Sequence, residues 1–343
     1  MTLAMAYAGA RGNTRDQMRH ALHFTLPDDR LHDALDALDQ AAAPPTQVPV
    51  DAGPQRFFLK SVNAVWASKG RTFVNSYVDL LAVNYGAGLH ILDFATKPDE
   101  SRQAINRWVR DETEQRIPEL LGPSTITDET VLVLTNAIYF LASWAHPFGS
   151  PPTRNGPFRR LDGSTSSAPF MHQMETMRAT MGTDYCAVDL DYVGEQVSML
   201  VVLPREGTFD SFVASLDSQG IERILGALST KMVALSLPKF SVHSKLNGKD
   251  ALEALGMTDA FDSNADFSGM DGTRGLTIRD VVQQATVSVD ERGTEAAAAT
   301  GVVMQVSISE HETLTIDGPF LFLIRDKATG AVLFLGRVVD AGA

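Results

Sequence analysis

A change of hydrophobic periodicity, about a third of the way along the 343 residues, constrains the fold most strongly. Before it, apolar side chains recur at the three- and four-residue spacing of helices, as in Asp28–Ala42, Phe73–Tyr85 and Ser101–Leu121. After it, β-branched and apolar runs predominate, beginning with Thr130–Phe140. Early helices followed by late strands predict an α+β fold.

The rest of the chain fits this division. Further strands are predicted within 187–203, including Gln196–Leu203, and at Met232–Val242, Leu276–Val289, Leu314–Ile324 and Ala331–Val339. Later helices are predicted only at Phe209–Leu216, Ile221–Leu228 and Gly248–Leu255. The apolar start, Met1–Ala10, lacks the basic segment of a signal peptide and predicts a buried helix. Because no stretch is rich enough in Pro, Gly or Ser to be a linker, residues 1–343 are predicted to form a single domain.

Composition excludes several classes of protein. Lys+Arg 29 against Asp+Glu 42 gives a net charge of -13, which disfavours nucleic acid and anionic membrane surfaces as partners. No apolar run of transmembrane length occurs. The single cysteine, Cys186, rules out an intramolecular disulfide and a cysteine-rich zinc site. Its strand-like surroundings predict a buried thiol rather than a nucleophile.

Motifs for catalysis or metal binding are absent from the sequence. It contains no nucleophile elbow, phosphate-binding loop, dinucleotide fingerprint or H-E-x-x-H pair. His20 and His23 have helical spacing but no third ligand, which favours a solvated helix face over a metal site. Asp262–Asp266 begins like a calcium loop, but Phe267 and Thr273 stand where Gly and Glu are needed, so a polar capping loop is predicted. We therefore expect no metal, no cofactor and no enzyme activity.

The segment after the predicted strand Leu276–Val289 is unusual, because small residues follow it where a linker would be polar. Four consecutive alanines could form a helical turn. That would not account for the threonines and glycines that flank them. Alternate residues of a strand face one side, so Thr294, Ala296, Ala298 and Thr300 would face together. Small side chains there suit a strand that slips between two others without overpacking the interior.

Five fragments, taken together, indicate a family. They are Glu291–Thr300, Asn136–Phe140 with Trp144 and Phe148 downstream, Leu237–Phe240, Asp317–Phe322 and Gly336–Val339. In order and spacing the chain resembles the serpins along nearly its whole length. The resemblance implies the serpin fold, with a large central β-sheet, two further sheets, about eight helices and an exposed reactive-centre loop at about 291–309.

The resemblance also implies a function, the suicide inhibition of serine endopeptidases. The protease would attack the loop, form an acyl-enzyme, and be trapped when the cut loop inserts into the central sheet. The implied hinge of the loop consists of Glu291, Gly293, Thr294, Glu295, Ala296, Ala297, Ala298, Ala299 and Thr300. Counting from Glu291 places the reactive bond between Ser307 and Ile308, and counting back from Pro319 places it one residue later. Because neither residue is basic, an elastase-like or subtilisin-like target is expected rather than a trypsin-like one.

Further residues match sites that control insertion in this family. Asn136 matches a polar cluster beneath the central strands, called the shutter, where Gln283 replaces the usual histidine. Trp144 matches an aromatic at the point of first insertion, called the breach. Lys239 matches the partner of Glu291 there.

Other properties follow from the same likeness. The expected partner is a serine protease, held in a covalent acyl complex, and the protein itself is expected to be a monomer. Heparin binding is not expected, because Phe73–Tyr85 carries no Lys or Arg. An extracellular location is implied, with a cytoplasmic one as the alternative. The first helix and short strand of the family, about 30 residues, have no match, so a serpin-fold carrier, storage or chaperone-like protein, or an inactive truncated product, stays the alternative function. An unrelated α+β enzyme is the remaining alternative.

Overall fold

The computed structural model describes residues 1–41, 57–86, 89–294 and 311–342. These residues form two compact units, which are taken separately below. The first contains residues 1–41, 60–139 and 243–286, and the second contains mainly residues 140–242 and 287–342. The prediction of a single domain stays a prediction.

Helices and a sheet of mixed direction make up the first unit. Its helices are α1 (Thr2–Gly9), α2 (Gly12–Ala21), α3 (Asp28–Ala41), α4 (Asn75–Tyr85), α5 (Pro98–Glu112), α8 (Lys249–Ala254) and α9 (Ser268–Asp271), with the short 3-10 helix η2 (Asp259–Phe261). The sheet to which its strands belong has the order β2-β1-β3-β11-β10-β9, in which β3 also pairs directly with β10. These strands are β1 (Phe57–Ser68), β2 (Leu89–Leu92), β3 (Leu132–Ser143), β9 (Phe240–Asn247), β10 (Asp280–Asp290) and β11 (Gly293–Thr294).

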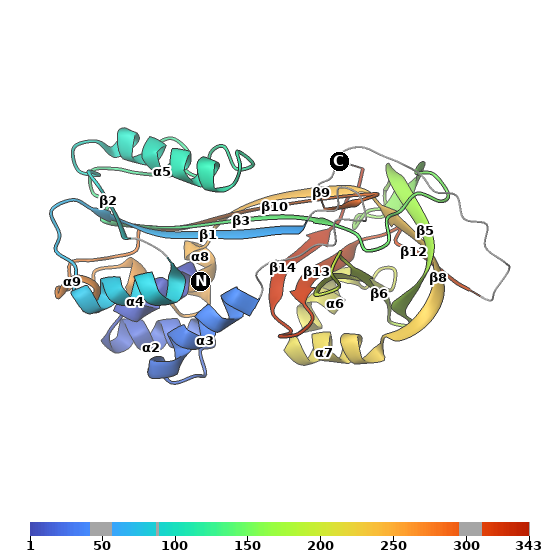
Figure 1. Ribbon diagram of the computed structural model, residues 1–343, viewed down its shortest axis with the longest axis horizontal. Helices are drawn as coiled ribbons and strands as arrows, with labels where there is room; N and C mark the ends of the chain where they lie inside the picture. The colour runs from blue at the N-terminus through green and yellow to red at the C-terminus, as the bar shows by residue number, and fades with distance from the viewer. Residues whose placement is uncertain (42–56, 87–88, 295–310, 343) are drawn as a thin grey trace. The chain divides into compact units, whose positions relative to one another are not determined.

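Both faces of this sheet are covered in the first unit. On β1, Val65 and Ala67 join a buried cluster with residues of α1, α2 and α4, whereas Ala64 and Trp66 join a second cluster with residues of α5. Figure 1 shows α5 on one face of the sheet and α2, α3 and α4 on the other. Alternate residues of a strand point to opposite faces, so a strand buried on both faces is apolar throughout.

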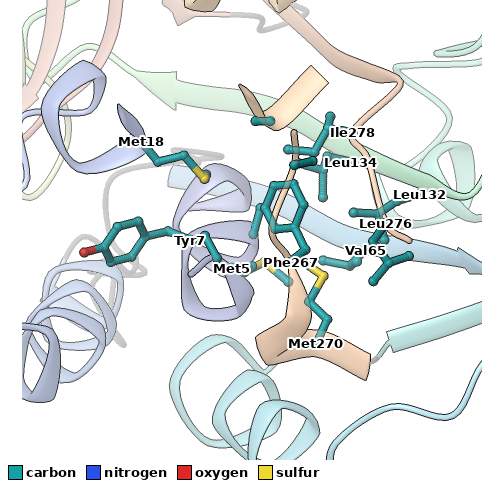
Figure 2. Close-up of a cluster of buried hydrophobic side chains, with 14 of the residues drawn as sticks. Met5, Tyr7, Met18, Val65, Leu132, Leu134, Phe267, Met270, Leu276 and Ile278 are labelled. Carbon is teal, nitrogen blue, oxygen red and sulfur yellow. The ribbon is translucent and has the colours of Figure 1, made fainter. Parts of the chain in front are cut away.

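The helix predicted at the start of the chain is confirmed. Met5 of α1 is fully buried and packs in the cluster that holds Phe267 and Met270 (Figure 2). Gly9 sits so close to this cluster that a Cβ there would lie 2.1 Å from Cγ of Met270. Burying a side chain of this size contributes about 1.5–3 kcal/mol, so α1 is part of the core.

Strands dominate the second unit. They are β4 (Arg154–Arg159), β5 (Thr165–Met181), β6 (Tyr185–Asp191), β7 (Val197–Pro204), β8 (Ser229–Pro238), β12 (Glu312–Thr315), β13 (Phe320–Asp326) and β14 (Val332–Val338), with helices α6 (Phe209–Ser215) and α7 (Ser218–Ala227). The sheet has the order β12-β8-β5-β6-β7-β13-β14, with β4 on β5. The two further sheets that were expected form one continuous sheet, because β5 is 17 residues long and pairs with β4, β6 and β8.

The α+β prediction is confirmed, and the described residues hold nine α-helices against about eight expected. None of these helices, within the part of the chain described, is long and apolar enough to cross a membrane. The helix predicted over Ser101–Leu121 is too long, since α5 ends at Glu112. The hydroxyl of Thr113 donates to the carbonyl of Val109 at 2.8 Å, and the next two residues, Glu114 and Gln115, have positive φ, so the helix cannot continue.

Several strand predictions need correction. Met232–Val242 is not one strand, because the chain passes from β8 to β9 at Lys239. Leu314–Ile324 is also two strands, since Asp317-Gly318-Pro319 separates β12 from β13. Proline has no N–H to donate to a neighbouring strand, which explains the break between β12 and β13. The strands β2, β4 and β5 were not predicted.

Candidate functional site

Two residues of the predicted hinge, Gly293 and Thr294, form the short strand β11 between β3 and β10. Thr294 lies opposite Ala142 of β3 and opposite Val289 of β10, antiparallel to both. Further along the same strands, β3 and β10 pair directly with each other in parallel, from Val133 with Asp280 to Tyr139 with Thr286. Two residues of the predicted loop are therefore paired within the sheet, and beyond them β3 and β10 pair directly with each other.

The position of Gly293 admits no side chain. Its φ is 155°, a conformation that residues with a Cβ rarely adopt. A Cβ would also lie 2.0 Å from the carbonyl oxygen of Ala142. Glycine is thus required both by the backbone conformation and by the close approach of β3.

Thr294 is fully buried and has a polar partner. Its Oγ1 lies 2.8 Å from the hydroxyl of Tyr192, and both residues have no exposed surface. Burial raises the pKa of Tyr192, so this phenol is neutral and can donate or accept the hydrogen bond. The Tyr192 ring stacks on Trp144, with ring centroids 4.4 Å apart and an interplanar angle of 13°.

Trp144 holds the turn that connects β10 with β11. Its indole Nε1 donates to the carbonyl of Asp290 at 3.0 Å, and its backbone N–H donates to the carbonyl of Arg292 at 2.7 Å. Phe148 adds a backbone bond of 2.7 Å to the carbonyl of Glu291. Trp144 thus fixes the turn by two hydrogen bonds while its ring supports Tyr192 beneath the hinge.

The predicted pair of Glu291 and Lys239 is formed. Lys239 Nζ lies 3.0 Å from one carboxylate oxygen of Glu291, and the hydroxyl of Thr153 donates to the other at 2.5 Å. Burial acts to raise the pKa of Glu291, but the hydrogen bonds from Thr153 and Lys239 outweigh it and the pKa lies below its ordinary value. Because about a third of each side chain is exposed, the ion pair contributes little to stability on its own.

The structure places Asn136 in a polar cluster in the first unit. Its Nδ2 donates to Oδ1 of Asn63 at 2.8 Å, and the hydroxyl of Thr2 donates to the same oxygen at 2.6 Å. Gln283 lies opposite Asn136 in the parallel pair of β3 and β10. The structure gives no hydrogen bond between these two side chains in the described residues, so Asn63 rather than Gln283 is the partner of Asn136.

Three residues in these sites were missed by the sequence argument. Tyr192 and Thr2 had no local signal, because each bonds a partner more than a hundred residues away in the chain. Tyr192 bonds the hydroxyl of Thr294, and Thr2 donates to the carbonyl of Thr135. Asn63 did have one, since it is a polar residue in the middle of the apolar run that forms β1. Such a residue needs a hydrogen-bond partner when buried, and that requirement could have singled it out.

The other predicted residues are placed as follows. Glu295–Thr300 and the reactive bond at Ser307 and Ile308 lie outside the described residues. His20 and His23 are both exposed, but only His20 lies on a helix, because α2 ends at Ala21 and His23 follows with positive φ; no group of three His, Cys, Asp or Glu suited to a metal occurs among the described residues.

The two remaining predictions had different outcomes. Asp266 caps the backbone of Ser268 at 3.1 Å, which confirms the polar capping loop. The prediction for Cys186 was only partly right, because the thiol is half-exposed and burial raises its pKa. The thiol is therefore protonated at neutral pH.

Comparison with known proteins gives a consistent result. A family model described as Serpin (serine protease inhibitor) matches residues 1–341. An uncharacterized serpin-like protein of Thermococcus kodakarensis is 36% identical over 342 residues, which cover 98% of this chain and 78% of that protein. The leukocyte elastase inhibitor of Homo sapiens is 33% identical over 353 residues, covering 98% of this chain and 89% of its own. Among solved structures, thyroxine-binding globulin in complex with thyroxine has a TM-score of 0.87 at 27% identity, over 100% of this chain and 90% of that one.

Proposed function

Since this chain belongs to the serpin family and has its fold, we propose that it is a suicide inhibitor of a serine endopeptidase. The observation that carries the proposal is the arrangement of β3, β10 and β11. Two parallel strands pair directly over seven positions, and the first two residues of the loop already separate them at one end. A strand antiparallel to both can extend from this point by replacing one parallel ladder with two antiparallel ones, which pair somewhat better per residue.

The side-chain pattern of the loop supports this insertion. Thr294 faces a buried interior, against Tyr192. Because side chains alternate along a strand, Ala296, Ala298 and Thr300 would follow Thr294 onto that face. Small side chains there neither overpack the interior nor bury a charge, and Glu295 would take the opposite face.

The chemistry of trapping follows from this geometry. The protease serine would attack the carbonyl carbon of Ser307, release the new amino terminus at Ile308, and remain bound as an acyl-enzyme. Insertion from Gly293 to Ser307, about 15 residues at about 3.3 Å each, would carry the acylated protease roughly 50 Å before water completes hydrolysis. Distortion of the protease would then disable its oxyanion hole, so the outcome is decided by the relative rates of insertion and hydrolysis.

The target we propose is an elastase-like or subtilisin-like enzyme, whose specificity pocket accepts small or aliphatic side chains. Val306, Ser307 and Ile308 are all of this kind, whether the reactive bond follows Ser307 or Ile308. The likeness to an elastase inhibitor supports the same class. The protein proposed is a monomer that acts outside the cell.

The test is incubation with an elastase-like and a subtilisin-like protease, followed by a denaturing gel and mass spectrometry. The expected result is a covalent species of chain plus protease that survives denaturation, with cleavage between Val306 and Ser309. Matched samples with an inactivated protease should give no such species. Complete cleavage without a covalent complex would refute the inhibitor and favour a serpin-fold substrate or carrier.

A further inference from the structure

A cavity of about 630 Å³ opens in the second unit, away from the hinge. Its wall is formed by the end of β4 and the turn to β5, the turn between β5 and β6, the end of β7, the start of α6 and the segment Gly318-Pro319. Its volume lies in the range of sites that enclose small organic molecules, roughly 300–1,000 Å³. The cavity is therefore large enough for a ligand rather than for a few waters.

The wall combines an apolar surface with guanidinium groups. Its apolar part includes Leu161, Leu203, Phe209 and Pro319, and Leu161 is 48% exposed. Its charged part consists of three arginines and two acidic residues, which are Arg159, Arg160, Arg205, Glu206 and Asp210. A ligand that fits such a wall has an apolar body and a negative charge.

The three arginines differ in how far they are already paired. Arg159 bonds Asp317 at 2.9 Å and also Glu206, and Arg160 bonds Asp340 at 2.6 Å. For Arg205, the described part of the chain supplies neither a hydrogen bond nor an ion pair to the guanidinium. Its backbone is nevertheless fixed, since its N–H donates to the carbonyl of Asp184 at 2.8 Å. Arg205 thus presents an uncommitted cation from an anchored position.

We propose that this cavity binds an organic acid with an apolar body, such as an aryl or alkyl carboxylate, sulfonate or phosphate ester. Arg205 holds the anionic group through charge-assisted hydrogen bonds, for which the planar guanidinium is well suited. Leu161, Leu203 and Pro319 contact the body of the ligand. The site is independent of protease inhibition, so the two proposals are tested separately.

Cys186 offers a direct measure of occupancy. It lines the cavity, is half-exposed, and is the single cysteine of the chain. Burial raises the pKa of its thiol, so alkylation by iodoacetamide is slow and its rate is easily followed at fixed pH. A ligand in the cavity covers the thiol and slows this reaction.

The experiment uses 1-anilinonaphthalene-8-sulfonate as the acidic probe and N-phenyl-1-naphthylamine, which lacks the sulfonate, as its neutral counterpart. Fluorescence titration measures both affinities for the full chain, for Arg205→Gln, and for Arg223→Gln, an exposed arginine on α7 that does not line the cavity. We expect Arg205→Gln to weaken the sulfonate about tenfold, with little effect on the neutral probe, and Arg223→Gln to change neither.

A second variant and the alkylation rate complete the test. Leu161→Gln, at an exposed position, should weaken both probes by about the same factor, because it reduces the apolar contact that they share. Saturating sulfonate should slow alkylation of Cys186 several-fold in the wild-type chain. Equal affinity of the sulfonate for Arg205→Gln and Arg223→Gln, or unchanged alkylation of Cys186 at saturation, would overturn the proposal.

Discussion

Replacing Thr294 with arginine tests the insertion mechanism at its first step. The Thr294 side chain is fully buried, between β3 and β10, and its hydroxyl bonds Tyr192. Thr294→Arg would bring a guanidinium into this site, where the described partner of the side chain is the neutral hydroxyl of Tyr192. A matched control is Thr72→Arg, the same substitution at an exposed threonine of the first unit.

The size of the effect follows from the contacts. Burying an unpaired cation costs at least several kcal/mol, and leaving the Tyr192 hydroxyl without a partner adds about 1–3 kcal/mol. Strand β11 contributes only two residues of pairing, at about 1 kcal/mol per hydrogen bond. Expelling β11 is therefore cheaper than burying the charge, so the variant should fold with an unpaired hinge. If only about 3 kcal/mol of the penalty remains in the barrier to insertion, insertion slows roughly a hundredfold.

The assay is the number of chains cleaved for each covalent complex formed with the protease. We expect Thr294→Arg to be cleaved as readily as the wild type but to yield roughly a hundredfold less complex, with Thr72→Arg resembling the wild type. Amide hydrogen exchange across Gly293–Thr294 should also become faster in Thr294→Arg without any protease present. If Thr294→Arg formed complex at the yield of Thr72→Arg, the reasoning that ties burial at this position to insertion would be refuted.

Three further substitutions probe the same sites. Gly293→Ala should expel β11, because a Cβ would collide with a carbonyl of β3, and limited proteolysis should then cut the hinge faster than in Gly122→Ala, whose added Cβ meets nothing. Glu291→Gln should lower the Tm by about 1 °C at pH 7 and by progressively less below pH 4.5, because a carboxyl whose pKa is lowered adds its full stability above the ordinary value of 4.5 and loses it as the pH falls through the lowered pKa. An unchanged pH dependence of Tm would contradict this. Asn136→Ala should lower the Tm by about 1–2 °C at a fixed scan rate, since one half-buried hydrogen bond worth about 1 kcal/mol is lost, and a wild-type Tm would rule out a structural role for that bond.

The fold class was predictable because local periodicity survives folding in most elements. The buried helix α1 and the apolar strand β3 were found instead from continuous apolar stretches, which are typical of elements buried on all sides. Strands β4 and β5 were missed because their burial is irregular, with exposed and buried residues in no strict alternation. Their pairing comes from partners elsewhere in the sheet, and such tertiary contacts override weak local preferences.

The candidate site was predictable to the extent that its chemistry is local. The run of small residues from Thr294 onward is a local pattern, and so is the glycine before it. The partners of these residues are not local, since Tyr192 and Trp144 reach the hinge only through the pairing of distant strands. Sequence reasoning therefore named the hinge, and the family resemblance added Trp144 and Lys239, but Tyr192 beneath Thr294 was missed.

Gly293 shows how the structure changes the meaning of a residue that the sequence singled out. From sequence alone, glycine at this position suggests freedom for the backbone to rearrange. The structure adds a second requirement, because the strand β3 passes so close that no side chain fits at all. Under the proposed mechanism, conformational freedom matters while the loop inserts, whereas the close approach of β3 matters once β11 is in place. Glycine at 293 would thus serve both states of that mechanism, and the close approach of β3 already explains why a residue that destabilises most strands stands at the first position of this one.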